Sequence, residues 1–380
     1  MRVAITSQPG AGHLNTLLGL ALALRDAGHE PTLYGAAGLR PEIEAHGLGF
    51  APAGVDWRES DLLTAFPEFL SEQPTGIAMD PALWPHLARP LAHDLEAHFA
   101  RRAPDVVVAE AFEYGSQLVA ERRGLPVAVV DTLVAGPVFA QRQRFGVPLE
   151  PARAALSLGP DPTGDVPYRH LRLLPVPERY DGPRPLPPAG ERFNLGLPGR
   201  PPPVEALPVP AGDAPLVLAS LGTVLHPRAG VREAVLDALR DEPVRVVFAL
   251  GPGADPAAYG PPGPGVLLAR RVPQPWLLPR CAVFVTHGGT NSVREALIAG
   301  TPLVVVPLGF DQPYHARRCA ALGLARVVAP EQRTPAAIRD AVRGVLDDAG
   351  MAERARAFAE EMAAMPDARA AVRRLERLAA

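Results

Sequence analysis

Short runs of apolar residues alternate along the chain with longer segments whose apolar positions recur at helical spacing. The first run covers residues 2–6. Residues 14–24 then place leucines and alanines on one helical face, and Gly28 follows as a natural helix C-cap. Further apolar runs cover residues 31–34, 105–109 and 126–130. Because these runs are continuous rather than alternating, the pattern predicts parallel strands that helices cover on both faces.

The same pattern restarts near the middle of the chain, so we expect a second parallel sheet. Its predicted strands cover residues 216–220, 244–250, 266–269, 281–285 and 303–306. A proline-rich stretch over residues 175–215 separates the two halves. It is typical of an extended connector, because proline removes backbone donors and blocks helix. A long surface loop within one domain would also fit, but the restarted pattern favours a linker between two domains.

These breaks predict the domain organisation. A last helix is expected over residues 367–378, after the break at Met365 and Pro366. The predicted units are an N-terminal domain over 1–197, a linker over 198–214, a C-terminal domain over 215–365 and a terminal helix over 366–380. Two domains also agree with the length of 380 residues.

Composition narrows the class of protein. An apolar fraction of 47% is enough for large cores, and the net charge of −3 argues against a nucleic-acid partner. The two cysteines, Cys281 and Cys319, form no disulfide framework and no metal-ligand cluster. No apolar run approaches the roughly 20 residues of a membrane span, and no signal peptide precedes the first strand, so we expect a cytoplasmic protein.

The most informative segment is Val285-Thr286-His287-Gly288-Gly289-Thr290-Asn291-Ser292-Val293-Arg294-Glu295. A predicted strand here meets a histidine and two glycines and turns at once into a helix. Glycines let the backbone approach a phosphate, and the free N–H groups of a helix N-terminus bind anions. A carboxylate at Glu295 is suited to ribose hydroxyls, and Asp311 and Gln312 after the next strand are suited to sugar hydroxyls. Alternatively, His-Gly-Gly is a common turn whose Thr or Asn caps a helix without any ligand.

The whole series, with Gly300-Thr301-Pro302 and Asp311-Gln312, resembles the donor-binding signature of family 1 glycosyltransferases. The resemblance is greatest to bacterial enzymes that glycosylate antibiotics and other natural products. It extends over nearly the whole chain and is strongest over residues 270–325. It implies the GT-B fold, in which two Rossmann-like, doubly wound parallel-sheet domains face a cleft. It also implies a C-terminal helix that returns to the N-terminal domain.

A candidate catalytic residue lies in the first strand–helix turn, Gln8-Pro9-Gly10-Ala11-Gly12-His13. Asn15 stands where the third glycine of a dinucleotide fingerprint is expected, which argues against a Rossmann cofactor site. The helix dipole disfavours an imidazolium at His13, so its ring suits a base that deprotonates a hydroxyl. A histidine that only caps the helix fits the turn equally well. The resemblance favours the base, since this turn carries the general base of the family.

The resemblance also pairs His13 with an acidic residue at the end of a later strand, where this chain has Glu110. Most relatives have Asp at this position. A carboxylate bound to one ring nitrogen would fix the tautomer and stabilise the charged ring. Glu110 would alternatively be a solvated loop carboxylate, and Glu113 and Asp131 are weaker substitutes.

The resemblance assigns further residues to the donor. Ser220, Gly222 and Thr223 match the turn that contacts the phosphate or the bridging oxygen, although such turns are common. Val272 and Gln274 resemble the segment that holds the nucleobase. Arg271 would stack on the base or remain a surface residue, and Trp276 fits packing better than binding. The full predicted donor set is Ser220, Gly222, Thr223, Arg271, Val272, Gln274, His287, Gly289, Thr290, Asn291, Ser292, Glu295, Asp311 and Gln312.

The acceptor site should be apolar and lie in the N-terminal domain. Aromatic residues in its least regular segments are candidates for lining it, although ordinary core packing would explain each of them. They are Phe66, Phe69, Trp84, Phe112 and Phe139.

The sequence therefore predicts an inverting, metal-independent glycosyltransferase that uses a dTDP- or UDP-sugar as co-substrate and needs no cofactor. Its acceptor would be a hydrophobic natural product. A homodimer and an auxiliary activator protein, which some relatives require, stay open. Two alternatives are a sugar-nucleotide epimerase of the same fold, which would need acidic groups around the anomeric carbon, and a catalytically silent partner. Intact His13, Asp311 and Gln312 argue against the silent partner.

Overall fold

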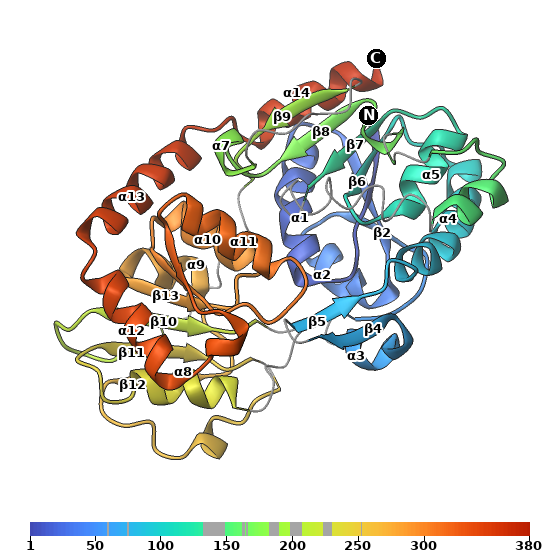
Figure 1. Ribbon diagram of the computed structural model, residues 1–380. Helices are drawn as coiled ribbons and strands as arrows, with labels where there is room; N and C mark the ends of the chain where they lie inside the picture. Colours follow the sequence, from blue (N-terminus) through green and yellow to red (C-terminus); the bar gives the residue numbers. More distant parts are fainter. Residues whose placement is uncertain are drawn as a thin grey trace. The chain divides into compact units, whose positions relative to one another are not determined.

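The computed structural model describes residues 1–58, 61–73, 76–131, 149–161, 164, 166–181, 190–197, 207–222, 230–251 and 253–380. The chain divides into two compact units. The first comprises Met1–Ser71, Met79–Arg200 and Met365–Ala380, and the second comprises Glu72–Ala78 and Pro201–Ala364. Both are built on parallel sheets with helices (Figure 1).

The first unit contains a sheet of seven parallel strands among the described residues. Their order in the sheet is β3 (Gly49–Pro52), β2 (Glu30–Gly35), β1 (Arg2–Thr6), β6 (Val106–Glu110), β7 (Val127–Val130), β8 (Leu171–Leu174) and β9 (Glu191–Asn194). Its helices are α1 (Ala11–Asp26), α2 (Arg40–Ala45), α3 (Leu62–Ala65), α4 (Leu83–Arg101), α5 (Tyr114–Arg122), α7 (Glu178–Asp181) and α14 (Ala368–Ala379). A separate pair of strands consists of β4 (Leu70–Gln73) and β5 (Gly76–Met79).

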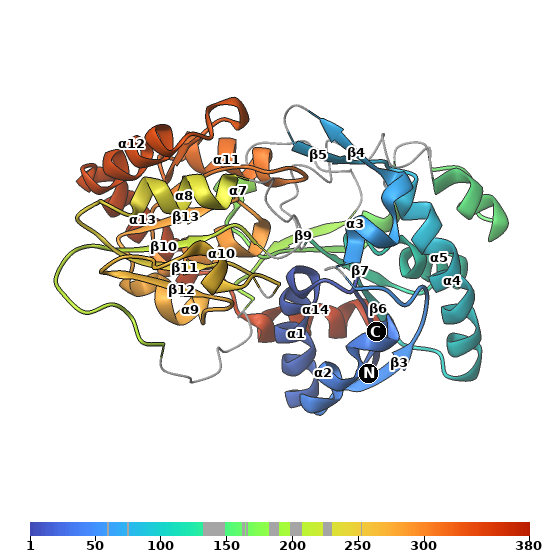
Figure 2. The same cartoon turned by 90° about the horizontal axis from the view of Figure 1, so that it is seen from below.

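Successive residues of the central strands alternate between two cores. Val106 and Val108 of β6 point to the face covered by α1 and α14, whereas Val107 and Ala109 point to the face covered by α4 and α5. Figure 2 shows these two pairs of helices on opposite sides of the sheet. A strand buried on both faces has no polar face to present, which explains the continuous apolar runs in the sequence.

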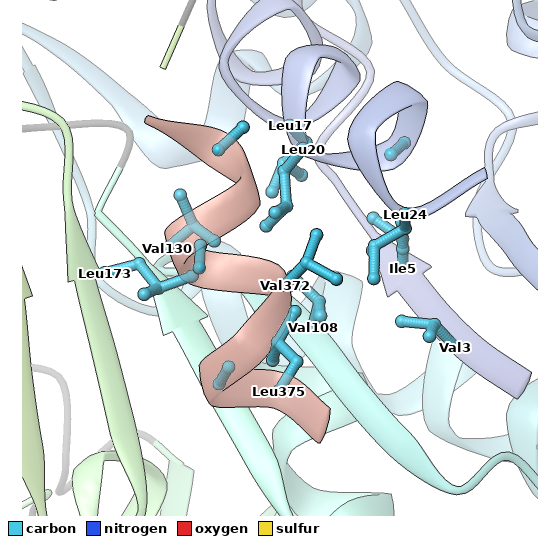
Figure 3. Packing of buried hydrophobic residues seen from close by; sticks show 14 of the residues in the cluster. Val3, Ile5, Leu17, Leu20, Leu24, Val108, Val130, Leu173, Val372 and Leu375 are labelled. Carbon is cyan, nitrogen blue, oxygen red and sulfur yellow. The ribbon is translucent and has the colours of Figure 1, made fainter. Parts of the chain in front are cut away.

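The C-terminal helix α14 packs into the core of the first unit. Val372 and Leu375 lie with Leu17, Leu20 and Leu24 of α1 (Figure 3). The Asp367 side chain caps the helix by accepting a hydrogen bond from the backbone N–H of Ala370. At the same helix, Arg374 donates to Glu191 of β9 at 2.7 Å and lies over the ring of Phe193. Thus the end of the chain completes the fold of the first unit.

The second unit contains six parallel strands among the described residues. Their order is β12 (Val266–Ala269), β11 (Arg245–Ala249), β10 (Leu216–Ser220), β13 (Val283–Thr286), β14 (Leu303–Val305) and β15 (Ala325–Val327). The helices are α8 (Val231–Leu239), α9 (Gln274–Leu277), α10 (Thr290–Ala299), α11 (Gln312–Ala321), α12 (Pro335–Leu346) and α13 (Ala349–Ala363). This strand order is that of a Rossmann-type sheet, whose direction of winding reverses between β10 and β13.

The structure corrects the predicted proline-rich connector. Within residues 175–215 it contains α7 and β9, and β9 pairs in parallel with β8. The prolines flank Glu191–Asn194 but do not enter it, so the backbone donors needed for pairing remain available. The predicted linker over 198–214 lies partly outside the described residues, which resume at 207. The prediction also did not separate residues 72–78 from the N-terminal domain, whereas the contacts group Glu72–Ala78 with the second unit.

Candidate functional site

In each unit several of the predicted site residues lie at the point where the winding of the sheet reverses. In the first unit this point lies between β1 and β6, and in the second it lies between β10 and β13. Ligands of open α/β sheets bind outside the carboxyl ends of the strands at such points. The turn that carries His13 follows β1, and Glu110 is the last residue of β6. Ser220 ends β10, and His287 directly follows β13.

The structure brings His13 and Glu110 together. His13 Nδ1 lies 3.2 Å from Glu110 Oε1. The Glu110 side chain is fully buried, while that of His13 is 19% exposed, so the ring has one buried side and one accessible side. Glu110 Oε1 also accepts a hydrogen bond from the backbone N–H of Phe112 at 3.2 Å. Glu110 is therefore a buried and oriented carboxylate, not the solvated loop residue of the alternative interpretation.

A second carboxyl group, that of Glu113, lies in the same cluster. The Gln8 amide donates to Glu113 Oε2 at 3.0 Å and to the backbone carbonyl of Phe112 at 3.2 Å. Burial, and next the nearby charge of Glu110, raise the pKa of Glu113 to about 8, although the Gly115 N–H and His13 oppose the shift. Glu113 thus holds its proton at neutral pH and is not a negatively charged partner for His13.

Asp131, the other substitute considered from the sequence, has a different partner. Its Oδ2 accepts a hydrogen bond from Arg172 Nε at 2.6 Å, and both side chains are buried. Burial raises the pKa of Asp131 to about 6, against the opposing charge of Arg172. Asp131 therefore belongs to an ion pair between the end of β7 and strand β8.

Two helices begin at the reversal points without a side-chain cap. The N-caps are Gly10 for α1 and Gly289 for α10, and neither provides a capping hydrogen bond. By contrast, α12, α13 and α14 are capped by the side chains of Thr334, Asp348 and Asp367. The first backbone N–H groups of α10 therefore keep their capacity to bind an anion.

The ring of His287 is held between two glycines. A Cβ atom at Gly222 would lie 2.7 Å from His287 Nε2, and one at Gly289 would lie 2.5 Å from the same atom. Burial lowers the pKa of His287 to about 4, although Asp311 and a hydrogen bond to the Ser220 backbone oppose the shift. His287 is therefore neutral near pH 7 and offers hydrogen bonding rather than a positive charge.

Thr290, Asp311 and Gln312 also converge at the carboxyl edge of the second sheet. Thr290 Oγ1 donates to Asp311 Oδ2 at 2.8 Å. Gln312 Oε1 accepts from the backbone N–H groups of Leu308 at 2.6 Å and Gly309 at 3.1 Å. The side-chain oxygen of Gln312 thus already accepts two hydrogen bonds from its own turn. Only the side-chain amide N–H groups remain for the predicted sugar contact.

The sequence interpretation missed His315 in this group. Its Nε2 lies 3.1 Å from Asp311 Oδ2 and 3.0 Å from Thr290 Oγ1, and the side chain is fully buried. A signal was present in the sequence, since His315 follows Asp311 by four residues and residues at that spacing are neighbours on a helix.

The predicted nucleobase and ribose residues contact each other. Gln274 Nε2 donates to Glu295 Oε2 at 2.6 Å, which links the start of α9 to α10. Burial raises the pKa of Glu295, and the Gln274 hydrogen bond opposes the shift. Arg271 is exposed and Val272 is half-buried. Arg280 lies 4.1 Å from the ring centre of Trp276, which agrees with a packing role for this tryptophan.

The remaining predicted residues fall in three places. Asn291 and Ser292 lie half-buried in the first turn of α10. Phe66 and Phe69 each pack against His86, at 5.9 Å and 5.3 Å between ring centres, and Trp84 lies 4.8 Å from Phe112. Thr223 and Phe139 lie outside the described residues. The four described aromatics thus form two ring clusters in the first unit.

In the part of the chain that the structure describes, no group of three or more His, Cys, Asp or Glu side chains is arranged to hold a metal ion. Among the same residues, no helix is both long enough and apolar enough to span a membrane.

Comparison with known proteins agrees with this arrangement. Residues 233–378 match the family model of the C-terminal domain of erythromycin biosynthesis protein CIII-like proteins. Demethyllactenocin mycarosyltransferase from Streptomyces fradiae is 28% identical over 383 residues, which cover 91% of this chain and 79% of that protein. The chain is a relative of antibiotic glycosyltransferases. NDP-glycosyltransferase YjiC from Bacillus licheniformis is 25% identical over 359 residues, which cover 90% of this chain and 88% of that protein.

Solved structures give the fold of this glycosyltransferase relative. The glycosyltransferase VinC, solved in complex with dTDP, superposes with a TM-score of 0.79 at 25% identity, over 100% of this chain and 99% of that one. The glycosyltransferase of kitacinnamycin superposes with the same TM-score of 0.79 at 24% identity, over 99% and 98% of the two chains. The two α/β units therefore have the GT-B fold.

Proposed function

We propose that this protein is an inverting glycosyltransferase that moves a sugar from a dTDP- or UDP-sugar to a hydroxyl group of a hydrophobic small molecule. The observation that carries the proposal is the distance of 3.2 Å between His13 Nδ1 and Glu110 Oε1 at the carboxyl edge of the first sheet. Relatives such as demethyllactenocin mycarosyltransferase of Streptomyces fradiae support a natural-product acceptor.

The proposed base is His13. With Nδ1–H directed to Glu110, the ring presents an unprotonated Nε2, which takes the proton of the acceptor hydroxyl. The acceptor oxygen then forms a bond to the anomeric carbon while the bond from that carbon to the phosphate oxygen breaks. The electron pair leaves with the nucleoside diphosphate, and the anomeric configuration inverts. The charge of Glu110 stabilises the imidazolium that forms.

The second unit holds the donor in this proposal. The first N–H groups of α10 would donate hydrogen bonds to the diphosphate and stabilise the charge that develops on the leaving group, and the neutral ring of His287 would lie against the same phosphates. Asp311 and the amide N–H groups of Gln312 would bind the sugar. Glu295, already held by Gln274 at 2.6 Å, would accept hydrogen bonds from ribose hydroxyls with its other oxygen.

The proposal is tested by measuring release of the nucleoside diphosphate from UDP-glucose and dTDP-sugars, with and without hydrophobic hydroxylated acceptors. We expect release that depends on the acceptor, a glycoside product detected by mass spectrometry, and inverted configuration at the anomeric carbon by NMR. Turnover of the sugar nucleotide without any acceptor would instead support the epimerase. Tight donor binding with no turnover on any acceptor would support the silent partner.

A further inference from the structure

Three side chains from two helices form a closed triangle of contacts in the second unit. Thr290 is the first residue of α10, Asp311 is the N-cap of α11, and His315 lies in the first turn of α11. Thr290 Oγ1 lies 2.8 Å from Asp311 Oδ2, His315 Nε2 lies 3.1 Å from the same oxygen, and His315 Nε2 lies 3.0 Å from Thr290 Oγ1. One carboxylate oxygen is thus fixed from two sides.

The direction of each hydrogen bond follows from the donors that are present. The Thr290 hydroxyl hydrogen goes to Asp311, so its oxygen is left as an acceptor towards His315. His315 Nε2 therefore carries a hydrogen, which it shares between Thr290 Oγ1 and Asp311 Oδ2. Burial alone raises the pKa of Asp311, but the hydrogen bond and charge of His315 and the bond from Thr290 outweigh it and hold this pKa below its usual value. Asp311 is accordingly ionised.

The backbone around Asp311 is held in an unusual conformation. Asp is a preferred N-cap residue, yet the Asp311 side chain makes no capping hydrogen bond to α11. The preceding Phe310 has φ of 55°, a left-handed conformation that costs an aromatic residue on the order of 1–3 kcal/mol. Gln312 Oε1 stabilises this turn by accepting from the N–H groups of Leu308 and Gly309. The local structure thus directs the carboxylate towards Thr290 instead of its own helix.

We propose that His315 is a positioning residue for the donor, which with Thr290 fixes Asp311 for contact with the sugar and ties that contact to the first turn of α10. The proposal rests on the proposed function, in which α10 binds the diphosphate and Asp311 binds the sugar. His315 is fully buried and touches neither ligand group in this scheme. Its effect should therefore appear in the part of the affinity that the sugar contributes.

The sugar contribution is measured as the ratio of two dissociation constants, that of the free nucleoside diphosphate and that of the matching NDP-sugar. The probes are UDP with UDP-glucose and dTDP with dTDP-glucose, titrated calorimetrically into the full-length protein. His315→Leu removes the ring donor. We expect it to reduce the sugar contribution about tenfold or more, as loss of a hydrogen bond to a charged group would, and to change diphosphate affinity less than threefold.

A double-mutant cycle isolates the link between the two residues. If His315 acts through Asp311, then His315→Leu adds little to the effect of Asp311→Ala on the sugar contribution. His315→Gln keeps an amide N–H near the position of Nε2 and should restore most of the contribution. His93→Leu is the matched control, because His93 forms a surface pair with Asp94 at 3.1 Å and is 86% exposed.

The outcomes separate this inference from the proposed function. If neither diphosphates nor NDP-sugars bind the wild-type protein, the proposed function itself fails. If they bind, but His315→Leu weakens both ligands equally or adds fully to Asp311→Ala, His315 has only a structural role and the inference is wrong. If thermal unfolding shows that His315→Leu does not fold, Thr290→Val decides the question. This variant keeps the backbone N–H of α10 and must lower the sugar contribution selectively.

Discussion

His13 Nδ1 and Glu110 Oε1 lie 3.2 Å apart, although the two residues come from the first turn after β1 and from the end of β6. Strands β1 and β6 are neighbours in the sheet, so their carboxyl ends deliver both side chains to one place. Because the Glu110 side chain is fully buried and also accepts from the Phe112 N–H, it has one defined orientation towards the ring. The following expectations rest on the proposal that His13 is a base and that the buried Glu110 orients it.

Glu110→Gln should lower kcat about 100-fold or more, because the neutral amide stabilises neither the correct tautomer nor the imidazolium. The KM for the NDP-sugar should stay within about twofold, since donor binding is assigned to the other unit. Glu110→Asp keeps the charge but withdraws the carboxylate by one methylene, and we expect a smaller loss of about tenfold. Steady-state kinetics of diphosphate release measure both, and equal losses in the two variants would contradict the role of the charge.

Glu113→Gln should stabilise the protein increasingly as pH rises. The folded state keeps the Glu113 proton until about pH 8, whereas the unfolded chain releases it near pH 4.5, the ordinary pKa of a glutamic acid. Deprotonation thus favours the unfolded state progressively between these two pH values, at a cost to folding on the order of a few kcal/mol. Removing the acid abolishes this cost.

The measurement for Glu113→Gln is the difference in melting temperature from wild type at pH 5 and at pH 8.5. We expect a small gain at pH 5 and a larger gain at pH 8.5. Glu353→Gln, at an exposed position of α13, is the control and should show no such pH dependence. A gain of equal size at both pH values would show that Glu113 is not held as a neutral acid.

Gly222→Ala should weaken donor binding by displacing His287. Its φ is 80°, and a Cβ would lie 2.7 Å from His287 Nε2, so the ring must leave its place between Gly222 and Gly289. Gly230→Ala is a matched control in the same unit, because Gly230 has a left-handed backbone with φ of 99° and nothing within 4 Å of its Cβ position. Both variants should lose about 1–2 kcal/mol of stability from the left-handed backbone. Only Gly222→Ala should raise the Kd of the diphosphate, about tenfold.

His287 should stay neutral across the physiological range. Because its pKa is lowered to about 4, NDP-sugar affinity should not change through its titration between pH 5.5 and 8.5. The NDP-sugar is the appropriate probe, since its doubly esterified diphosphate does not titrate in this range. An unfolded histidine takes a proton below about 6.5, so the fold loses stability as pH falls from there towards 4. His287→Asn should reduce that acid-induced loss in thermal unfolding.

The parts of the fold that the sequence predicts well are those buried on both faces. The runs at Arg2–Thr6 and Leu216–Ser220 coincide with β1 and β10. Strand β9 carries polar residues such as Arg192, and prolines lie in its flanking segments, so composition over residues 175–215 indicated a connector. Tertiary pairing with the sheet overrides that local signal.

The sequence also predicts part of the candidate site, because some of its residues belong to local sequence patterns. His13 and His287 lie next to glycines at strand–helix turns, a pattern that is local in sequence. The protonation state of Glu113 depends on its burial and on its hydrogen bond with Gln8, which is far away in the sequence. The spacing of residues along the chain therefore could not predict this protonation state. Likewise, the side-chain oxygen of Gln312 accepts hydrogen bonds from the backbone N–H groups of Leu308 and Gly309, so only its amide N–H groups remain as donors. These bonds depend on backbone geometry, which the sequence pattern does not show.

The central claim is that His13 is the base of a glycosyl transfer, and the most direct test is the kcat of His13→Ala with a functional acceptor. The account predicts a loss of about 10²- to 10⁴-fold in acceptor-dependent kcat, with diphosphate affinity and melting temperature close to wild type. His93→Ala, which changes an exposed histidine of the same unit, should retain full activity. Acceptor-dependent turnover by folded His13→Ala at a rate near that of wild type would contradict the account.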